Sequence, residues 1–405
     1  MSALLSGWQL LKEPHLRKVL SALDAENRST RIVGGAVRNA LMGQPVVDAD
    51  LATIFPPKEV IARAEAAGLK TAPTGIDHGT VTVIADGHPF EVTTLRRDVE
   101  TDGRRAVVHF TQDWVQDASR RDFTMNALYC DIGGTVLDPV GGLDDLKAGR
   151  VRFIGNAEDR IREDYLRILR FFRFTGWYGK GRPDAEGIKA CAKLKSGIAT
   201  LSAERAWAEL KRLLKAPDPA RALLWMRTTE VLPKVLPESW GIDAIHRLLA
   251  AEKSEGWTPD ALLRLESILP PHRPRIDALA ERLRLSRAEA ARLLAWVDAP
   301  EPDPNVTEIG FSKALYRKGT EGTVDRIRHA LAREIDKGNT EAAEKLRRLV
   351  RTAAAWTKPV FPVTGKDLVA AGATPGPDVG VRLRALEERW IESGFSLSRD
   401  ALLQA

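Results

Sequence analysis

Two hydrophobic periodicities divide the chain. Between about residues 28 and 147, short β-branched runs such as VTVIAD (81–86) and HPFEVTTLR (88–96) are separated by glycines, which predicts strands and a hairpin around Gly87. From about residue 148 onward, apolar residues recur every three or four positions, as in amphipathic helices. Residues 1–27 predict one or two further helices. We therefore expect an α/β region between a short helical extension and a long helical part.

Prolines divide the helical part. PDP (217–219) and APEPDPN (299–305) interrupt the periodicity and predict boundaries. We therefore expect helical segments over 148–216, 217–300 and 301–405. A chain of 405 residues is also too long for one ordinary core and predicts two to four domains.

Composition narrows the class of protein. Hydrophobic residues make up 44% of the chain and charged residues 29%, as in globular proteins, and a net charge of +6 weakly favours an anionic partner. Cys130 and Cys191, the only cysteines, argue against a disulfide framework or a cysteine zinc site. Because no signal-peptide core or run of about 18 apolar residues is found, we expect a cytoplasmic protein without a membrane partner.

The stretch RIVGGAVRNALMGQPVVDADLAT (31–53) combines a glycine pair with two carboxylates. It predicts a strand, a break at Gly34-Gly35, a short helix from Ala36 to Met42, and a second strand that carries Asp48 and Asp50. Alternate strand residues face the same way, so the aspartates would place hard oxygen ligands side by side, as Mg²⁺ bound with substrate phosphates requires. Each feature alone favours a plain turn or cap by roughly four to one.

The same stretch predicts a phosphate site. Gly35 allows close approach of the backbone to an anion, and the helix start offers N–H groups. Arg38 adds a fork of guanidinium donors. Together with the aspartates, these features indicate a metal-dependent nucleotide site.

The order and spacing of the glycine pair, the arginine and the two aspartates make the prediction of a nucleotide site more specific. The pattern G-G-x-V-R-x-x-L-x-G followed by D-x-D-x-x-T, together with RRDFTMNALYCD (120–131), closely resembles the head motifs of the class II tRNA nucleotidyltransferase and bacterial poly(A) polymerase family. Asn39 departs from that pattern, because the family usually has Asp after the arginine. The resemblance implies an α+β fold, in which a nucleotidyltransferase-type α/β head with a small mixed sheet (28–147) precedes an all-helical neck (148–216), body (217–300) and tail (301–405).

The resemblance also implies roles for residues. Asp48 and Asp50 would be the catalytic ligands of two Mg²⁺ ions. Arg120 would lie nearest the triphosphate, and Asp122 and Asn126 would contact ribose hydroxyls. The full set expected to bind the nucleotide is Gly35, Arg38, Arg120, Arg121, Asp122, Asn126, Asp164, Arg167, Arg170 and Arg173.

The run EDYLR (163–167) carries a hypothesis on base recognition. On one helix, Asp164 and Arg167 are i, i+3 neighbours and can form a planar pair of acceptor and donors. The alternative is a surface salt bridge between the two side chains, worth about a few tenths of a kcal/mol. In the family, the carboxylate would accept from the amino group of cytosine or adenine while the guanidinium donates to the ring nitrogen. Guanine and uracil invert this pattern, at a cost of about 1–3 kcal/mol per unsatisfied group. Arg170 and Arg173 follow at steps of three as supports for base or phosphate binding.

Two neighbouring features leave alternatives open. Glu91 lies on the opposite strand face from Phe90 and Val92, and this alternation favours a solvent-facing carboxylate over a third metal ligand by roughly two to one. Residues 98–119 read as an exposed loop, but by resemblance they match a flexible loop of family members that add all three nucleotides. That match favours an enzyme able to add A.

These implications predict a CCA-adding tRNA nucleotidyltransferase with CTP, ATP and the tRNA acceptor arm as partners and no DNA partner. The Arg- and Lys-rich segment 313–351 would follow the tRNA backbone. The nearest alternative is a poly(A) polymerase or an A-only adding enzyme. A non-catalytic RNA-binding protein would have a degraded metal pair, and a small-molecule nucleotidyltransferase would need no basic helical half.

Overall fold

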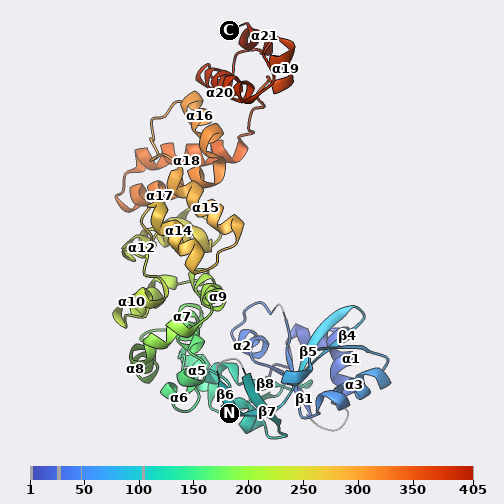
Figure 1. Cartoon of the computed structure of the whole chain (residues 1–405). Coiled ribbons are helices and arrows are strands. Elements are labelled where there is room, and N and C mark those ends of the chain that lie inside the picture. The colour runs from blue at the N-terminus through green and yellow to red at the C-terminus, as the bar shows by residue number, and fades with distance from the viewer. Residues whose placement is uncertain (1–2, 25–28, 47, 103–104, 405) are drawn as a thin grey trace. The chain divides into compact units, whose positions relative to one another are not determined.

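The computed structural model describes residues 3–24, 29–46, 48–102 and 105–404, and the chain forms two compact units, residues 1–235 and 236–405 (Figure 1). The first unit contains a mixed sheet with strand order β3-β4-β5-β2-β1-β8-β9. Its strands are β1 (Thr30–Val33), β2 (Leu51–Thr53), β3 (Lys70–Gly75), β4 (Thr80–Ala85), β5 (His88–Thr94), β8 (Tyr129–Cys130) and β9 (Val136–Leu137). Strands β2 and β5 are parallel, whereas the other neighbours are antiparallel.

The predicted hairpin around Gly87 is confirmed. Strands β4 and β5 pair from Thr80 opposite Thr93 to Ala85 opposite His88. Asp86 and Gly87 between them have φ values of 50° and 86°, as a tight two-residue hairpin turn requires. The sequence signal was strong because β-branched runs flanked a residue that tolerates positive φ.

Helices pack on the sheet and join it to the neck. The helices of this region are η1 (Gln9–Lys12), α1 (Pro14–Leu23), α2 (Gly35–Leu41), α3 (Pro57–Ala66), η2 (Ile76–His78), α4 (Trp114–Ser119), η3 (Thr124–Asn126) and α5 (Gly142–Ala148). Helices α1 and α3 pack against β4 and β5. The apolar stripe of α1, from Leu16 to Leu23, is buried there, which confirms the amphipathic helix expected within residues 1–27.

The exposed-loop interpretation of residues 98–119 is wrong for the residues that the structure describes. Strands β6 (Arg96–Asp102) and β7 (Arg105–Phe110) form a separate antiparallel ribbon, and α4 follows; residues 103–104 lie outside the description. Main-chain pairing holds the ribbon together from Arg96 opposite Phe110 to Asp102 opposite Arg105. The sequence did not predict these two strands because it is charged and lacks an alternation of apolar and polar residues. A ribbon outside the main sheet does not require that alternation.

The neck helices share a core with the sheet region. The helices of the segment predicted as neck are α6 (Ala157–Glu163), α7 (Leu166–Tyr178), α8 (Ala185–Leu194), η4 (Lys195–Thr200) and α9 (Ala203–Leu214). Helices α10 (Pro219–Thr228) and α11 (Leu232–Val235) follow in the segment predicted as body. Phe123 lies 4.9 Å from Phe153 and 5.0 Å from Phe174 of α7, measured between ring centroids. Trp207 and Leu210 of α9 are buried, and α9 packs on α7.

The described part of the second unit contains helices and no strand. These helices are α12 (Asp243–Glu255), α13 (Ala261–Glu266), α14 (Arg273–Arg282), α15 (Arg287–Asp298), α16 (Glu308–Lys318), α17 (Thr320–Asp336), α18 (Thr340–Ala355), α19 (Gly365–Ala370), α20 (Pro377–Glu392) and α21 (Arg399–Leu403). Among the residues described, no helix combines the length and apolar character needed to cross a bilayer. The predicted α+β class, with a small mixed sheet followed by helices, is confirmed.

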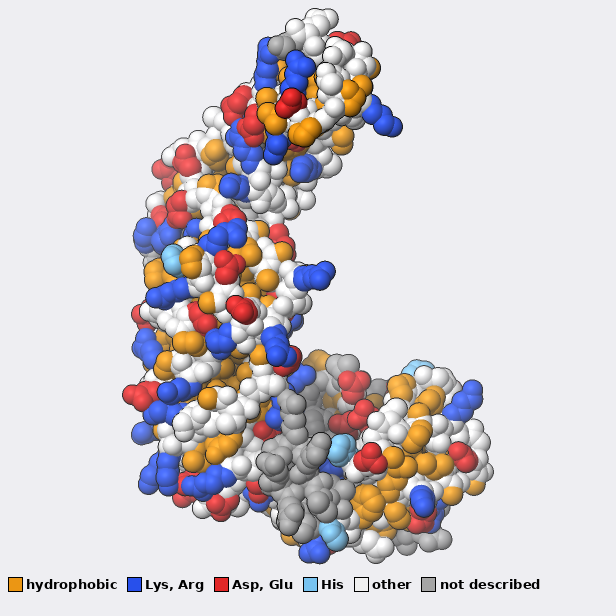
Figure 2. Space-filling model, in the orientation of Figure 1, with side chains coloured by type: hydrophobic (Ala, Val, Ile, Leu, Met, Phe, Trp, Pro, Cys, Tyr) orange, Lys and Arg blue, Asp and Glu red, His pale blue; other side chains and the backbone are white. Residues whose placement is uncertain are grey.

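Basic side chains of the second unit are interspersed with acidic ones. In Figure 2, Lys and Arg alternate with Asp and Glu over the visible helical surface. Within the segment 313–351, Arg347 pairs with Glu255 at 2.8 Å and Lys345 with Glu341 at 2.6 Å. This segment is therefore more evenly neutralised than its Arg and Lys content indicated.

Candidate active site

A cavity of about 470 Å³ in the first unit brings the predicted nucleotide-binding residues together. Ten of the expected residues line it, namely Gly35, Arg38, Asp50, Arg120, Arg121, Asp122, Asn126, Asp164, Arg167 and Arg170. With Arg205 included, the described lining contains six arginines and three aspartates. Such an excess of guanidinium groups suits a polyanion such as a triphosphate.

The aspartate pair lies at the start of a strand. Asp48 and Asp50 precede β2, which begins at Leu51, so the prediction that the strand carries both carboxylates is wrong. The Val33 amide still donates to the Asp50 carbonyl at 2.9 Å, which fixes the backbone of this aspartate beside β1. Gly34, with φ 71°, turns the chain from β1 into α2 in a conformation that favours glycine.

Three carboxylates line one cavity near the start of this strand. Asp48, Asp50 and Glu91 line a second cavity, and Asp50 lines both cavities. Because Leu51 pairs with Val92 in the parallel ladder, Asp50 and Glu91 are the residues immediately before paired positions. Glu91 is exposed, as the alternation indicated. It nevertheless lines the same cavity as Asp48 and Asp50.

The electrostatics of these carboxylates fit a cation. Burial raises the pKa of Asp50, and the negative charges of Glu91 and Asp48 raise it further, while Arg121 lowers it. Among the described residues, no three acidic, His or Cys side chains converge into a complete metal site by themselves. Mg²⁺ in phosphate-transfer sites is commonly held by one or two carboxylates plus water and substrate phosphates, so the donor set fits such an ion.

Asp117 of α4 orients two arginines of the cavity and was missed from the sequence. Its Oδ1 accepts from Arg120 at 2.7 Å, and its Oδ2 accepts from Arg121 at 3.0 Å and from the Tyr129 hydroxyl at 2.7 Å. Burial would raise the pKa of Asp117, but Arg121, Arg120 and Tyr129 together lower it to about 2. The i, i+3, i+4 spacing of the three charged residues was the available signal.

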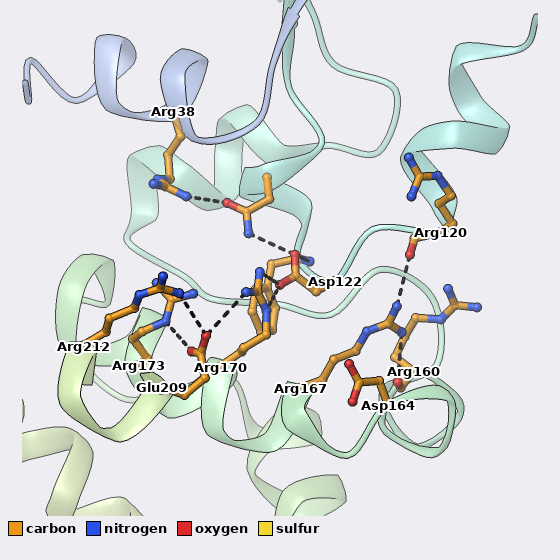
Figure 3. Close-up of polar contacts among 12 residues, drawn as sticks. Arg38, Arg120, Asp122, Arg160, Asp164, Arg167, Arg170, Arg173, Glu209 and Arg212 are labelled. Atoms are coloured by element: carbon orange, nitrogen blue, oxygen red, sulfur yellow. Dashed lines mark hydrogen bonds and ion pairs between the residues drawn. The ribbon is translucent and has the colours of Figure 1, made fainter. Parts of the chain in front are cut away.

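A chain of hydrogen bonds links Arg38 to Arg170 (Figure 3). Arg38 Nη1 donates to Asn126 Oδ1 at 2.5 Å, and Asn126 Nδ2 donates to Asp122 Oδ1 at 2.9 Å. Arg170 Nε donates to Asp122 Oδ2 at 2.7 Å. Asp122 and Asn126 line the cavity, but these bonds engage their side chains with arginines, and the expected ribose contacts stay a prediction.

Asn39 also holds Arg38. Its Oδ1 accepts from Arg38 Nη2 at 2.9 Å and from Nε at 3.2 Å, and its Nδ2 donates to the Pro45 carbonyl at 3.1 Å. The Tyr178 hydroxyl accepts a further bond from Arg38 Nη2 at 2.7 Å. The departure from the family pattern therefore preserves an acceptor for this guanidinium while removing a negative charge beside it.

Arg173 does not line the cavity. Its Nε donates to Glu209 Oε2 at 2.5 Å, and its guanidinium lies 4.4 Å from the Phe174 ring centroid. Glu209 is buried and also lies 3.8 Å from Arg170. Arg173 thus contacts Glu209, as Figure 3 shows, and the prediction that it binds the nucleotide stays a prediction.

The predicted continuous helix through EDYLR is wrong, and the alternative of a salt bridge between Asp164 and Arg167 is wrong too, because each side chain has other partners. Helix α6 ends at Glu163 and α7 begins at Leu166, because Asp164 is extended, with φ −156° and ψ 108°. Its Oδ1 accepts from the Leu166 amide at 3.1 Å and its Oδ2 from Arg205 Nη2 at 2.6 Å. An aspartate that accepts from a nearby amide competes with helix continuation.

Arg167 makes its own contacts beside Asp164. Its Nη1 donates to the Arg160 carbonyl at 2.9 Å and to Glu163 at 2.5 Å, and its Nη2 donates to the Arg120 carbonyl at 3.2 Å. These contacts use three of the five N–H groups of the guanidinium. Both side chains face the same cavity, so they can act on one ligand without contacting each other.

Comparison with known proteins agrees with this arrangement. The poly A polymerase head domain family matches residues 30–152, and the family described as the probable RNA and SrmB-binding site of polymerase A matches residues 183–241. The mitochondrial CCA tRNA nucleotidyltransferase 1 of Mus musculus is 34% identical over 403 residues, covering 98% of this chain and 90% of the relative. The CCA-adding enzyme of Geobacillus stearothermophilus is 34% identical over 381 residues, covering 91% and 90%.

Solved structures extend the comparison. The Bacillus stearothermophilus CCA-adding enzyme in complex with CTP has a TM-score of 0.73 at 30% identity, with 94% of each chain covered. The Thermotoga maritima CCA-adding enzyme complexed with tRNA has a TM-score of 0.65 at 19% identity, covering 100% of this chain and 98% of that one, which shows the common fold.

The head and its arginine-rich cavity define a nucleotidyltransferase. The chain belongs to the class II tRNA nucleotidyltransferase and bacterial poly(A) polymerase family. A divalent metal requirement is general in such families, and the carboxylates beside the cavity fit it.

Proposed function

We propose that this protein adds C, C and A to the 3′ end of tRNA from CTP and ATP. The 3′-hydroxyl attacks the α-phosphate of the nucleotide, an ester bond forms, and pyrophosphate leaves. The observation that carries the proposal is one cavity lined by six arginines of the described chain, by Asp50 and by Asp164. Relatives named CCA tRNA nucleotidyltransferase and CCA-adding enzyme, which match over 98% and 91% of this chain, support it.

The arginines divide between phosphate binding and support. Arg120 and Arg121, oriented by the buried carboxylate of Asp117, would bind the triphosphate. Arg38 would contribute from α2, where Asn126 and Asn39 fix its guanidinium. The positive charge comes from side chains already held in place, so little rotamer entropy is lost when the nucleotide binds.

The carboxylates would hold the metal. Asp48 and Asp50 would hold two Mg²⁺ ions, and Glu91, which lines the same cavity, is the candidate for a third donor. When bound, such ions lower the pKa of the attacking hydroxyl and stabilise charge on the leaving oxygens. The residues themselves position that chemistry next to the arginines, since Asp50 lines both cavities.

Asp164 and Arg167 would select the base without a nucleic-acid template. Asp164 would accept from the amino group shared by cytosine and adenine, and Arg167 would donate to the ring nitrogen. Arg205 keeps the Asp164 carboxylate in place at 2.6 Å. Arg205 is therefore a positioning residue for base selection.

The remaining segments would hold the RNA. We assign catalysis to the head (28–147), base recognition to the neck (148–216), and tRNA binding to the body (217–300) and tail (301–405). Recognition would run through the RNA backbone, because one enzyme serves many tRNA sequences. A reducing compartment such as the cytoplasm suits Cys130 and Cys191, which are both buried and free.

The test uses purified protein, Mg²⁺ and a tRNA lacking its last three nucleotides. Labelled CTP alone should add two residues, and ATP should then add a third, with no addition by the Asp48→Ala variant. Long A tails without use of CTP would instead assign the poly(A) or A-only activity. No incorporation with any nucleotide would contradict the proposal and favour an RNA-binding role.

Replacing Asp164 with Asn should weaken base selection. The amide would present an N–H₂ donor or a misoriented oxygen to the cytosine amino group, so kcat/KM for CTP should fall about 5- to 150-fold, the range of 1–3 kcal/mol for an unsatisfied buried group. The ratio of CTP to UTP incorporation should fall with it. Single-nucleotide kinetics with each triphosphate measure both.

Two further variants separate base reading from general damage. Arg205→Gln should lower the same CTP to UTP ratio, and its effect should not add to that of Asp164→Asn, because both act on one carboxylate. Asp159→Asn in α6, whose side chain is 65% exposed, should leave the ratio unchanged. Full additivity would overturn the positioning role of Arg205.

A further inference from the structure

A second cavity lies beside the nucleotide cavity in the first unit. It has a volume of about 810 Å³ and is lined from η1, α1, β4 and β5 and by residues 48–50. Asp50 lines both cavities, and the volume falls within the range of about 300–1,000 Å³ that is usual for sites of small ligands. Only its carboxylates have a role in the function proposed above, so most of this cavity is without an assigned occupant.

The two cavities differ in charge. The described lining of the nucleotide cavity contains six arginines, whereas that of the second cavity contains neither lysine nor arginine. The acidic residues around the second cavity are Glu13, Asp48, Asp50 and Glu91. A triphosphate would meet carboxylates there and no guanidinium group, so the second cavity suits an uncharged group that lies next to the metal ligands.

Most of the other residues that line the second cavity are apolar or aromatic. They are Leu10, His15, Leu16, His88, Pro89 and Phe90. His15 and Leu16 belong to α1, and the last three belong to β5. Nucleobases stack on aromatic side chains, histidine included, so the cavity offers a surface for a base.

His15 and His88 form an ordered aromatic pair. Their ring centroids lie 4.0 Å apart and the ring planes differ by 15°. His15 Nδ1 lies 3.1 Å from Asp86 Oδ2, and His88 Nδ1 lies 3.3 Å from the Asp86 carbonyl oxygen. Lys18 of α1 also pairs with Asp86. The hairpin turn therefore holds both rings in place, while His88 stays exposed and the His15 side chain is 30% exposed.

The chemistry of the proposed reaction requires a place for a second nucleotide. In an in-line transfer, the attacking and leaving oxygens lie on opposite sides of the phosphorus. The arginines would hold the leaving pyrophosphate in the first cavity, so the attacking 3′-hydroxyl has to come from outside the arginine cluster. The second cavity adjoins the first at Asp50, and a ribose there would lie beside Asp48 and Glu91.

The end of the RNA also changes during the proposed reaction. The terminal base is first that of the shortened tRNA and then C at each of the next two steps. Stacking tolerates such changes because every base has a π-face, whereas hydrogen-bond readout distinguishes bases. Besides the carboxylates, the described lining has only Thr82 and the two histidines as hydrogen-bonding side chains, so the cavity favours recognition by stacking.

We propose that the second cavity binds the unpaired 3′-terminal nucleotide of the RNA, with its base stacked on the aromatic surface of His15, His88 and Phe90 and its ribose beside the metal-binding carboxylates. The site rests on the proposed function, because it is the place from which the 3′-hydroxyl would attack. The N-terminal extension supplies one side of the site through Leu10, His15 and Leu16.

The test places the fluorescent base 2-aminopurine at the 3′ end of a tRNA that lacks C, C and A, and uses full-length protein without any nucleotide. Stacking quenches 2-aminopurine, so the unchanged protein should quench its emission on binding. The double variant His15→Ala/His88→Ala should lose that quenching at protein concentrations that saturate the tRNA, as filter binding verifies. Equal quenching by the double variant would overturn the site.

Two matched variants separate stacking from a structural role. His88→Phe keeps an aromatic ring but removes the contact with the Asp86 carbonyl, so it should retain quenching. Loss of quenching in this variant would assign His88 to holding the hairpin and overturn the proposal. His78→Ala removes an exposed histidine of the same unit that lines neither cavity and should quench like the unchanged protein.

Steady-state kinetics then connect the site with turnover. The double variant should raise KM for tRNA about tenfold, as expected for the loss of one base–aromatic contact, and leave KM for CTP unchanged. A fall in kcat with both KM values unchanged would contradict the proposal. The fluorescence result does not depend on incorporation: quenching that requires the histidines in a protein that adds no nucleotide would refute the proposed function and leave the RNA-end site standing.

Discussion

Replacing Asp50 with Asn should reduce the rate of nucleotide incorporation by about 1000-fold. The change keeps the shape of the side chain but removes a charge from the carboxylate group that lines both cavities. Loss of one preorganised electrostatic contact to a reacting group commonly costs about 10²–10³ in kcat, and a metal ligand stands at the upper end of that range. Single-turnover incorporation of CTP into tRNA at saturating Mg²⁺ measures the effect.

The controls define which carboxylates matter. Asp144→Asn, an exposed aspartate of α5, should leave the rate within about twofold, as surface substitutions usually do. Glu91→Gln tests the third donor: a loss comparable with that of Asp50→Asn would add Glu91 to the metal ligands, and an unchanged rate would leave it a solvent-facing side chain. An active Asp50→Asn enzyme would contradict the metal assignment.

Replacing Asp117 with Asn should lower the free energy of unfolding by about 3–5 kcal/mol, the range for breaking a buried ion pair from one side. The Asp117 side chain is 1% exposed and its two arginines are 16% and 20% exposed. The substitution leaves both guanidinium groups without their counter-charge and presents an amide donor to them. Urea unfolding followed by circular dichroism measures the loss.

The pH dependence of the Asp117 contribution has a definite sign. Because the pKa of Asp117 is lowered to about 2, against about 3.9 in an unfolded chain, its contribution is present above pH 4. It is lost as the pH falls towards 2, so the stability difference between Asp117→Asn and the unchanged protein should shrink over that interval. Asp113→Asn at the N-cap of the same helix should cost little, because Asn caps as well as Asp; an equal loss there would refute the ion-pair explanation.

Sequence reasoning found the first residues of the site because their spacing is local, whereas the family resemblance supplied those from Arg120 onward. Gly34, Arg38 and Asp50 fall within one strand–turn–helix stretch, and their approximate placement needed only the alternation and the glycine break. The same reasoning started the second strand at Asp48 instead of Leu51, because the residue pattern does not show where main-chain pairing begins.

Apart from Asp117, the residues that sequence reasoning missed act across long separations. Arg205 reaches Asp164 over 41 positions, and Glu209 reaches Arg173 over 36. The periodicity of a helix does not predict such distant partners, since each arginine by itself is typical of a solvent-exposed helix position. The interrupted helix at Asp164 was missed for a related reason: local propensity favoured a continuous helix, whereas the aspartate forms hydrogen bonds with Leu166 and Arg205.

The bonds that run from Arg38 through Asn126 and Asp122 to Arg170 bear on how such enzymes can be recombined. The chain starts in α2 and ends in α7, so a chimera cut between them and given a foreign neck would keep Asp122 and lose its ion-pair partner Arg170. The buried carboxylate of Asp122 would then have no counter-charge unless the new neck supplied one. Exchange of parts among relatives should succeed when residues 30–178 move together and fail when the sheet and α7 come from different parents.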